Sequence, residues 1–334
     1  MDKPNIVIVS TNFGTNFSGG STVTAEVFAR IQDDFKQIVF VGSQVGEHAV
    51  RNLIFIQSRN WIKTYFLLRK LKKTHTLFYG DFYDSFLLAL ARTNYVFTYH
   101  DNWPELAGLG LRQYFHSLFY NPIYSYIFRN AAKLTTVSEY KKQLIAKQTA
   151  TKVKVIPNGF NQIDGAKKET GKSGILMVGN IDQRKYKLAI ELFNTIDLTD
   201  NLRIDIYGHI VDPQVAKHLK KFPFVTLKGF NKEIPYSSYQ FLLHTSFIES
   251  FGMVFLEAIS QGLPVLAFDR GGAKEIISEG NGVLITPYEI DSMRDTLFQL
   301  LNYPKKSDPT TVIKYSWEKA TESYRKVFAV TIGV

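Results

Sequence analysis

Two glutamates in one short segment could bind a ligand rich in phosphate and hydroxyl groups. Residues 248–258 read IESFGMVFLEA, so Glu249 and Glu257 lie eight positions apart, with Gly252 between them at an expected helix start. The first turn of a helix has free backbone N–H groups and a partial positive charge, which suit a pyrophosphate, and a glycine lets the phosphate approach closely. Carboxylates on either side would accept hydrogen bonds from sugar or ribose hydroxyls. By residue type alone, the segment fits such a site and a solvated helix start equally well.

A second group places cations shortly after an expected strand. The strand at residues 175–178 is followed by Gly179, and Arg184 and Lys185 come next in a basic turn. Two cations here would stabilise the negative charge that develops on a departing diphosphate. The structural alternative is a basic turn exposed to solvent.

The first half of the chain has a histidine at an expected strand end. His100 and Asp101 follow the strand at residues 95–99, and histidine commonly serves as a general acid or base. The other histidines follow no motif and are interpreted as structural or surface residues. The turn after the first strand is rich in glycine, but its spacing is not G-x-G-x-x-G, which disfavours a dinucleotide site. These glycines are Gly14, Gly19 and Gly20.

The elements that must position these residues are short apolar runs alternating with helical stretches. Strands are expected at residues 6–10, 37–41, 52–57, 76–79, 95–99, 134–137 and 153–156, and then at 175–178, 202–207, 225–227, 241–244 and 265–268. Helices are expected at residues 21–33, 61–73, 85–92, 188–193, 252–261, 290–301 and 316–328, with Ser138 as a further helix N-cap. This alternation predicts parallel sheets covered on both faces, with ligands at the carboxyl ends of the strands.

The pattern restarts once, which predicts two doubly wound domains with a ligand cleft between them. The length of 334 residues also favours about two domains. The polar stretch at residues 161–173 is the expected linker. We therefore expect domains at residues 1–160 and 161–312, followed by a C-terminal helical segment at residues 313–334, which by its pattern alone could pack on either domain.

Composition excludes several classes of protein. The chain is 45% hydrophobic and has no cysteine, which excludes a disordered chain, a disulfide scaffold and thiolate metal sites. The first residues predict a buried strand rather than a signal peptide, and no uncharged apolar stretch reaches the roughly 18 residues needed to span a bilayer. We therefore expect a soluble or peripheral protein in the cytoplasm.

The positive charge is concentrated in the first half. Residues 1–160 hold 19 basic and 10 acidic residues, whereas the whole chain has a net charge of +10. Nucleic acid, an anionic membrane surface or a phosphorylated substrate would each suit this charge. Residues 59–73 interleave lysine and arginine with aromatic residues, and residues 113–128 are rich in aromatic residues; such helices can pack in a core or lie on an anionic membrane. No recognised nucleic-acid module is present, so nucleic acid is not an expected partner.

Several motifs together resemble the retaining GT-B glycosyltransferases of family GT4. The segment with Glu249 and Glu257 is similar to that family's E-x7-E motif, and the resemblance runs in order from about residue 5 to residue 330. The supporting segments are TYHDNWP at 98–104, LTTVS at 134–138, VKVIPNGF at 153–160, ILMVGNIDQRK at 175–185, and the stretch from Gly262 to Glu275. One departure is Asn180, which stands where the family usually has arginine and leaves open which residue supplies the second cation.

The resemblance implies a GT-B fold, with two Rossmann-like domains facing across a cleft and the last helix returning to the first domain. It implies that Glu249, His100 and Lys185 are catalytic, with Glu249 binding donor-sugar hydroxyls and Lys185 stabilising the departing diphosphate. The implied donor-binding residues are Gly19, Gly20, Gly179, Arg184, Lys185, Ser250, Phe251, Gly252, Met253 and Glu257. It implies neither a metal nor a cofactor, and the absence of a D-x-D triplet from the sequence agrees.

The implied reaction moves a hexosyl group from a nucleotide sugar, with a UDP-sugar expected first, to a hydroxyl of a glycan or lipid-linked acceptor, with retention of configuration. The first domain would bind the acceptor and the second the donor, in the synthesis of cell-surface polysaccharide or glycoconjugate. An anionic membrane surface is a further expected partner, at the inner face of the membrane. The alternatives are an inactive GT-B partner subunit, which only the Asn180 departure favours, a sugar-nucleotide epimerase, and a nucleic-acid binder.

Overall fold

The computed structural model describes residues 3–15, 19–161, 174–197 and 202–333. It divides into two compact units, residues 1–159 with 315–334, and residues 160–314. The expected linker at residues 161–173 lies, except for residue 161, outside the described residues. So do three residues of the glycine-rich turn, 16–18.

The first unit is built on a seven-stranded parallel sheet. Its strands follow the order β5-β3-β1-β6-β7-β8-β9. Their bounds are β1 Asn5–Val9, β3 Gln37–Gly42, β5 Leu53–Gln57, β6 Leu77–Gly80, β7 Tyr95–Tyr99, β8 Lys133–Thr136 and β9 Val153–Val155. Four successive residues of β1, Ile6 to Val9, are buried. Because neighbouring side chains of a strand point to opposite faces, the sheet must be covered on both sides, as expected for a parallel sheet.

Helices and short turns connect these strands. The helices are α1 Gly19–Ile31, α2 Trp61–Leu71, α3 Phe86–Leu90, α4 Leu111–Asn130, α5 Glu139–Ala146 and α11 Trp317–Ile332. Short strands β2 Asn12–Phe13 and β4 Gln44–Val45 pair beside the sheet, and 3-10 turns occur at η1 Gln32–Asp34, η2 Tyr83–Ser85 and η3 Glu105–Leu109. The Ser138 hydroxyl accepts a hydrogen bond from the backbone N–H of Lys141, which confirms the predicted cap of α5.

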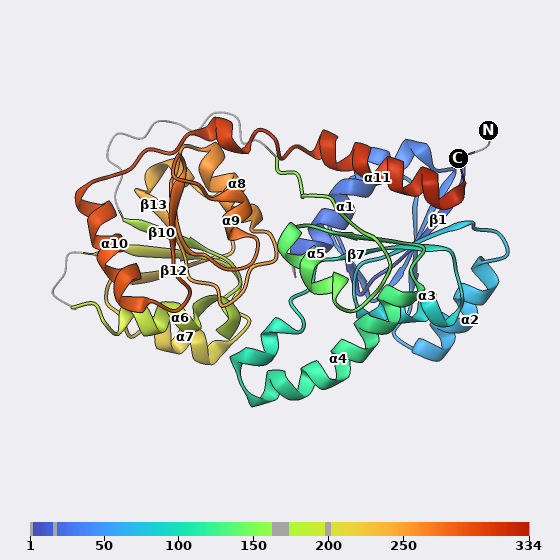
Figure 1. Cartoon of the computed structure of the whole chain (residues 1–334), viewed down its shortest axis with the longest axis horizontal. Coiled ribbons are helices and arrows are strands. Elements are labelled where there is room, and N and C mark those ends of the chain that lie inside the picture. The colour runs from blue at the N-terminus through green and yellow to red at the C-terminus, as the bar shows by residue number, and fades with distance from the viewer. Residues whose placement is uncertain (1–2, 16–18, 162–173, 198–201, 334) are drawn as a thin grey trace. The chain divides into compact units, whose positions relative to one another are not determined.

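The last helix, α11, packs within the first unit. It lies beside α1, as Figure 1 shows with α11 in red and α1 in blue. The ring of Phe328 lies 6.0 Å from that of Phe28, and Arg325 Nε lies 2.7 Å from Asp34 Oδ2. The apolar face of α11 therefore completes the core of this unit although it is more than 150 residues distant in sequence from the rest.

The second unit is built on a six-stranded parallel sheet in the order β12-β11-β10-β13-β14-β15. Its strands are β10 Ile175–Val178, β11 Ile204–Tyr207, β12 Val225–Gly229, β13 Phe241–His244, β14 Val265–Phe268 and β15 Gly282–Ile285. Its helices are α6 Gln183–Phe193, α7 Pro213–Leu219, α8 Met253–Ser260, α9 Ala273–Ile276 and α10 Ile290–Asn302, with 3-10 turns η4 Tyr236–Ser238 and η5 Pro309–Val312. The strand β15 and the helices α7 and α9 were not predicted from the sequence pattern.

Both sheets contain one point where the strand order reverses. In the second unit the chain moves outward from β10 to β11 and β12, and then continues on the other side of β10 with β13, β14 and β15. In the first unit the same reversal lies between β1 and β6. The connections that leave two such strands diverge, and open α/β sheets bind ligands outside the carboxyl ends of the strands at this point. We therefore expect ligands to bind at these two places.

Candidate active site

Lys185 is positioned by the first turn of α6, which follows β10. Asp182 caps this helix by accepting a hydrogen bond from the backbone N–H of Lys185 at 2.9 Å. Gly179, at the end of β10, has a positive φ of 146°, and a side chain there would come within 3.1 Å of Lys185 Cδ and Cε. The cap fixes the start of the helix, and the glycine leaves room for the lysine side chain.

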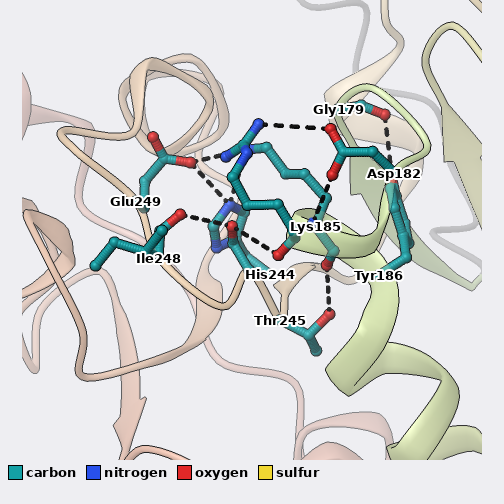
Figure 2. A network of polar contacts seen from close by, with 10 residues as sticks. Gly179, Asp182, Lys185, Tyr186, His244, Thr245, Ile248 and Glu249 are labelled. Carbon is teal, nitrogen blue, oxygen red and sulfur yellow. Dashed lines mark hydrogen bonds and ion pairs between the residues drawn. The ribbon is translucent and has the colours of Figure 1, made fainter. Parts of the chain in front are cut away.

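Glu249 lies in the loop between β13 and α8, and Lys185 binds it directly. Lys185 Nζ lies 2.7 Å from Glu249 Oε2, and both side chains are mostly buried. Figure 2 shows the pair together with His244, the last residue of β13, whose Nε2 lies 3.3 Å from Lys185 Nζ and 3.4 Å from Glu249 Oε2. Three side chains from α6, β13 and the following loop thus meet at the point where the strand order reverses.

The loop that carries Glu249 is held through its backbone. The N–H of Gly272 donates to the carbonyl oxygen of Glu249 at 2.9 Å. Gly271 has a φ of 68°, and a side chain there would strike the same carbonyl oxygen, at 1.9 Å. On the other side, the N–H of Phe247 donates to the carbonyl of Arg184 at 2.7 Å. The loop between β14 and α9 and the start of α6 therefore both set the position of the carboxylate.

The charges at this place are strongly coupled. Burial raises the pKa of Glu249, but the positive charges of Lys185 and Arg184 outweigh it and hold the pKa well below its usual value. Burial and the positive charge of Lys185 lower the pKa of His244 to about 4. At neutral pH Glu249 is therefore a carboxylate and the His244 imidazole is neutral.

Arg184 lies near this group without pairing with Glu249. Its Nη2 lies 3.9 Å from Asp182 Oδ2, and its charge lowers the pKa of both Glu249 and His244. Arg184 is thus placed to add positive charge where Asn180 replaces the arginine that the sequence motif would have.

The start of α8 has the geometry of an anion-binding turn. Gly252 precedes the helix with a φ of 94°, and a side chain there would lie 2.3 Å from the ring of Phe255. No side chain caps the helix at Gly252, so its first backbone N–H groups suit a phosphate. Ser250 and Phe251 are buried in the approach to this turn, and Met253 begins the helix.

Glu257, on the second turn of α8, has a separate partner. The Tyr236 hydroxyl donates a hydrogen bond to Glu257 Oε2 at 2.6 Å. Burial raises the pKa of this carboxyl, and the hydrogen bond from Tyr236 acts against the increase. The two glutamates of the motif therefore have different environments: Glu249 is paired with a cation and Glu257 with a neutral phenol.

The predicted residues of the first unit meet at the carboxyl edge of its sheet. A side chain at Gly20, in the first turn of α1, would come within 3.2 Å of His100 Cβ and 3.0 Å of Phe82 Cζ, so Gly20 lies directly against His100. Burial lowers the pKa of His100 to about 4. Around Gly19 the described residues leave open space, and Asp101 Oδ2 accepts a hydrogen bond from the Tyr124 hydroxyl at 2.5 Å.

The sequence interpretation missed the contact that His244 makes. It assigned every histidine except His100 to structural or surface roles because no motif surrounds them. The available signal was its position, since His244 ends a strand of buried residues at the edge where ligands bind. A buried polar side chain at such a strand end is a candidate functional residue even without a motif.

Two broader features concern metals and membranes. Within the described ranges, no group of three or more histidine, aspartate or glutamate side chains is arranged to hold a metal ion. Among the same residues, no helix combines the length and the apolar character that crossing a membrane requires.

The two parallel α/β units, each with a strand reversal, define the GT-B fold. The fold of HepE from Anabaena in complex with UDP and glucose superposes with a TM-score of 0.78 at 16% identity, covering 98% of this chain and 100% of that one. Residues 160–316 match the family model for glycosyl transferases group 1, and residues 25–162 match that for glycosyltransferase family 4. The chain thus has the GT-B fold, and its two halves each match a glycosyltransferase family model.

Two relatives in sequence carry related descriptions. An uncharacterized glycosyltransferase of Methanocaldococcus jannaschii is 26% identical over 215 residues, which is 61% of this chain and 61% of that protein. The GtfA subunit of a UDP-N-acetylglucosamine–peptide N-acetylglucosaminyltransferase of Streptococcus parasanguinis is 30% identical over 196 residues, which is 51% of this chain and 38% of that protein. The matches span less than two thirds of either relative.

Proposed function

We propose that this chain is a retaining hexosyltransferase that takes a sugar from a UDP-sugar and transfers it to a hydroxyl of a glycan or lipid-linked acceptor. The observation that carries the proposal is the contact of Lys185 Nζ with Glu249 Oε2 at 2.7 Å, beside the open start of α8. In this pair, Lys185 supplies a cation that can stabilise a leaving diphosphate, and Glu249 supplies a carboxylate that can bind sugar hydroxyls.

Each residue then has a distinct role in the second unit. The N–H groups at Gly252 and Met253 bind the diphosphate, Lys185 and Arg184 stabilise its charge, and Glu257 binds the ribose hydroxyls. Glu249 binds hydroxyls of the donor sugar. Within the first unit, we propose that His100, Gly19 and Gly20 also contact the donor, and the tight approach of Gly20 to His100 supports this grouping.

The reaction needs no metal in this proposal. The bond between the anomeric carbon and the phosphate oxygen breaks, and its electron pair leaves with UDP. The acceptor oxygen bonds to the same face of that carbon, and its proton passes to the departing phosphate. Lys185 and Arg184 favour this step because they bind the diphosphate more strongly as its negative charge increases.

The donor base is proposed from the relatives together with the site. HepE was solved with UDP and glucose, and the streptococcal relative is described as using UDP-N-acetylglucosamine. A uridine nucleotide is therefore the first donor to test for this chain.

We also propose that the protein works at the inner, cytoplasmic face of an anionic membrane. The helix α2 exposes Ile62 and Phe66 at 70% and 65%, and Lys63, Arg69 and Lys70 lie on the same helix. Apolar and basic side chains on one exposed helix suit an anionic lipid surface. In sedimentation at low salt, phosphatidylglycerol vesicles should retain the protein and phosphatidylcholine vesicles should not, and the I62S/F66S variant should lose retention. Equal recovery in both supernatants would contradict membrane binding.

The transfer proposal is tested by measuring UDP release from UDP-glucose, UDP-galactose and UDP-N-acetylglucosamine in EDTA. The K185M variant should lose at least about 10²-fold in rate, in line with removal of one charge-stabilising donor. The matched control is K187M, because Lys187 is exposed two positions further along α6, and it should keep the wild-type rate. No release from any of the three donors, or equal rates for the two variants, would refute the assignment.

A further inference from the structure

His244 stands at the centre of the polar contacts in the second unit. It ends β13, is 6% exposed, and packs edge-on against the ring of Phe255, with centroids 4.7 Å apart. Its Nε2 faces two partners of opposite kind, Lys185 Nζ at 3.3 Å and Glu249 Oε2 at 3.4 Å, as Figure 2 shows.

The chemistry of these partners prevents one imidazole nitrogen from bonding to both. An ammonium group can only donate a hydrogen bond, so Nε2 must accept from Lys185. A carboxylate can only accept, so Nε2 must carry a hydrogen to bond with Glu249. A neutral imidazole has one hydrogen, on either Nδ1 or Nε2, and burial beside Lys185 keeps the His244 ring neutral. The tautomer therefore decides whether Nε2 accepts a hydrogen bond from Lys185 or donates one to Glu249.

The needs of the two partners change when a diphosphate binds. In the structure, Glu249 has its ion pair with Lys185, so an Nε2 without hydrogen can accept from the same ammonium. A diphosphate that attracts Lys185 would weaken that ion pair. The mostly buried carboxylate of Glu249 would then lack a hydrogen-bond donor. Leaving a buried charge without a partner is strongly unfavourable.

We propose that His244 is a positioning residue whose Nε2 accepts a hydrogen bond from Lys185 in the empty site and donates one to Glu249 when a nucleotide diphosphate is bound. One hydrogen moves from Nδ1 to Nε2 through solvent, and the ring stays neutral throughout. The exchange keeps Glu249 fixed for the sugar hydroxyls while Lys185 serves the diphosphate. This inference rests on the proposed function of the site.

The direct test is NMR of the full chain with 15N-labelled histidine, with and without saturating UDP. The two tautomers have distinct nitrogen shifts and couplings, and the H244Q variant assigns the His244 signals among those of the seven histidines. We expect the Nδ1–H tautomer in the free protein and the Nε2–H tautomer with UDP. The same tautomer in both states, with UDP binding proved by calorimetry, would overturn this inference alone. Failure of UDP to bind would overturn the donor assignment as well.

Two variants separate positioning from packing. Glutamine can turn its amide to offer either an oxygen or an N–H group, whereas leucine fills the space and offers neither. We expect H244Q to keep kcat within about 10-fold of the wild type, and H244L to lose at least about 30-fold in kcat while its Kd for UDP changes by less than about 5-fold. The control is H218L, which removes an exposed histidine of α7 and should leave both values unchanged. Equal losses in H244Q and H244L, or a wild-type kcat in H244L, would contradict the role.

Discussion

Lys185 Nζ lies 2.7 Å from Glu249 Oε2, although the two residues are 64 positions apart in the chain. The strand order explains the contact, because β10 and β13 are neighbours and the segments that leave them carry one residue each. In the structure, Glu249 thus pairs with the cation that we assign to the diphosphate. When a donor binds, Lys185 must then interact with both the Glu249 carboxylate and the diphosphate.

Replacing Glu249 by glutamine should separate nucleotide binding from transfer. E249Q keeps the shape of the side chain but removes the charge that competes for Lys185. We expect the affinity for UDP to stay equal or to rise by up to about 10-fold, while kcat for transfer falls by about 10²-fold. Calorimetry and steady-state kinetics measure the two effects, and E279Q, at an exposed glutamate, is the control. A parallel loss of UDP affinity and kcat would instead indicate that Glu249 binds the nucleotide rather than the sugar.

The sequence predicts the fold well because its evidence is local. Alternating strands and helices, and the Ser138 cap, can be read from neighbouring residues, and they lead to the two parallel sheets that the structure contains. The missed strand β15 is only four residues long and begins with glycine, which is rare within strands. The helix α4 has Pro122 in its interior and no clear apolar face, so the periodicity expected of a surface helix is missing.

The candidate site could be predicted only in part, since its geometry depends on distant contacts. Lys185 and Glu249 were singled out individually by motifs, but their ion pair requires the order of β10 and β13. His244 has no motif at all. Its importance comes from the position of its Nε2 between an ammonium and a carboxylate, which no local pattern contains.

Gly271 should be far more sensitive to substitution than Gly262. Both residues have positive φ, 68° and 71°, so alanine at either costs about 1–2 kcal/mol of backbone strain. Around Gly262 the described residues leave space, whereas a side chain at Gly271 would strike the carbonyl of Glu249 at 1.9 Å. We expect urea unfolding to show a clearly larger loss for G271A than for G262A, with loss of transfer only in G271A. Similar losses of stability would show that the loop relaxes without cost.

Asp81 should make the stability of the first unit depend on pH. Burial raises the pKa of this carboxyl to about 7, although Thr24 donates a hydrogen bond to it. The folded state then binds a proton that the unfolded state releases above about pH 4. The contribution of Asp81 to stability is therefore present at pH 4 and is lost as the pH rises to 7, by about 2–4 kcal/mol.

The D81N variant tests this dependence. It mimics the protonated carboxyl, so its stability should match the wild type near pH 4 and exceed it at pH 8. Urea denaturation at several pH values gives the comparison. The D33N variant removes an exposed carboxylate that pairs with Arg51, and it should change stability by less than about 1 kcal/mol. Parallel curves for D81N and the wild type would show that Asp81 does not titrate in this range.

Tyr236 should support nucleotide binding through Glu257. Its hydroxyl lies 2.6 Å from Glu257 Oε2, and loss of this donor should raise the pKa of Glu257 further and release its side chain. We expect Y236F to weaken UDP binding by about 10-fold. This factor corresponds to the free energy that one hydrogen bond to a charged group contributes. Y239F is the matched control, because the Tyr239 hydroxyl donates instead to Asp205. If both variants weaken UDP binding equally, Glu257 is not the ribose ligand.

The most direct test of the whole account is calorimetry of the wild-type chain with UDP, GDP, ADP and dTDP in EDTA, repeated with K185M. We expect a micromolar Kd for UDP that is at least about 10-fold below those of the other nucleotides, and an affinity for UDP that is about 10-fold or more lower in K185M. Absence of binding by all four nucleotides, or UDP binding that disappears in EDTA and returns with Mg²⁺, would contradict a metal-free donor site built on Lys185 and Glu249.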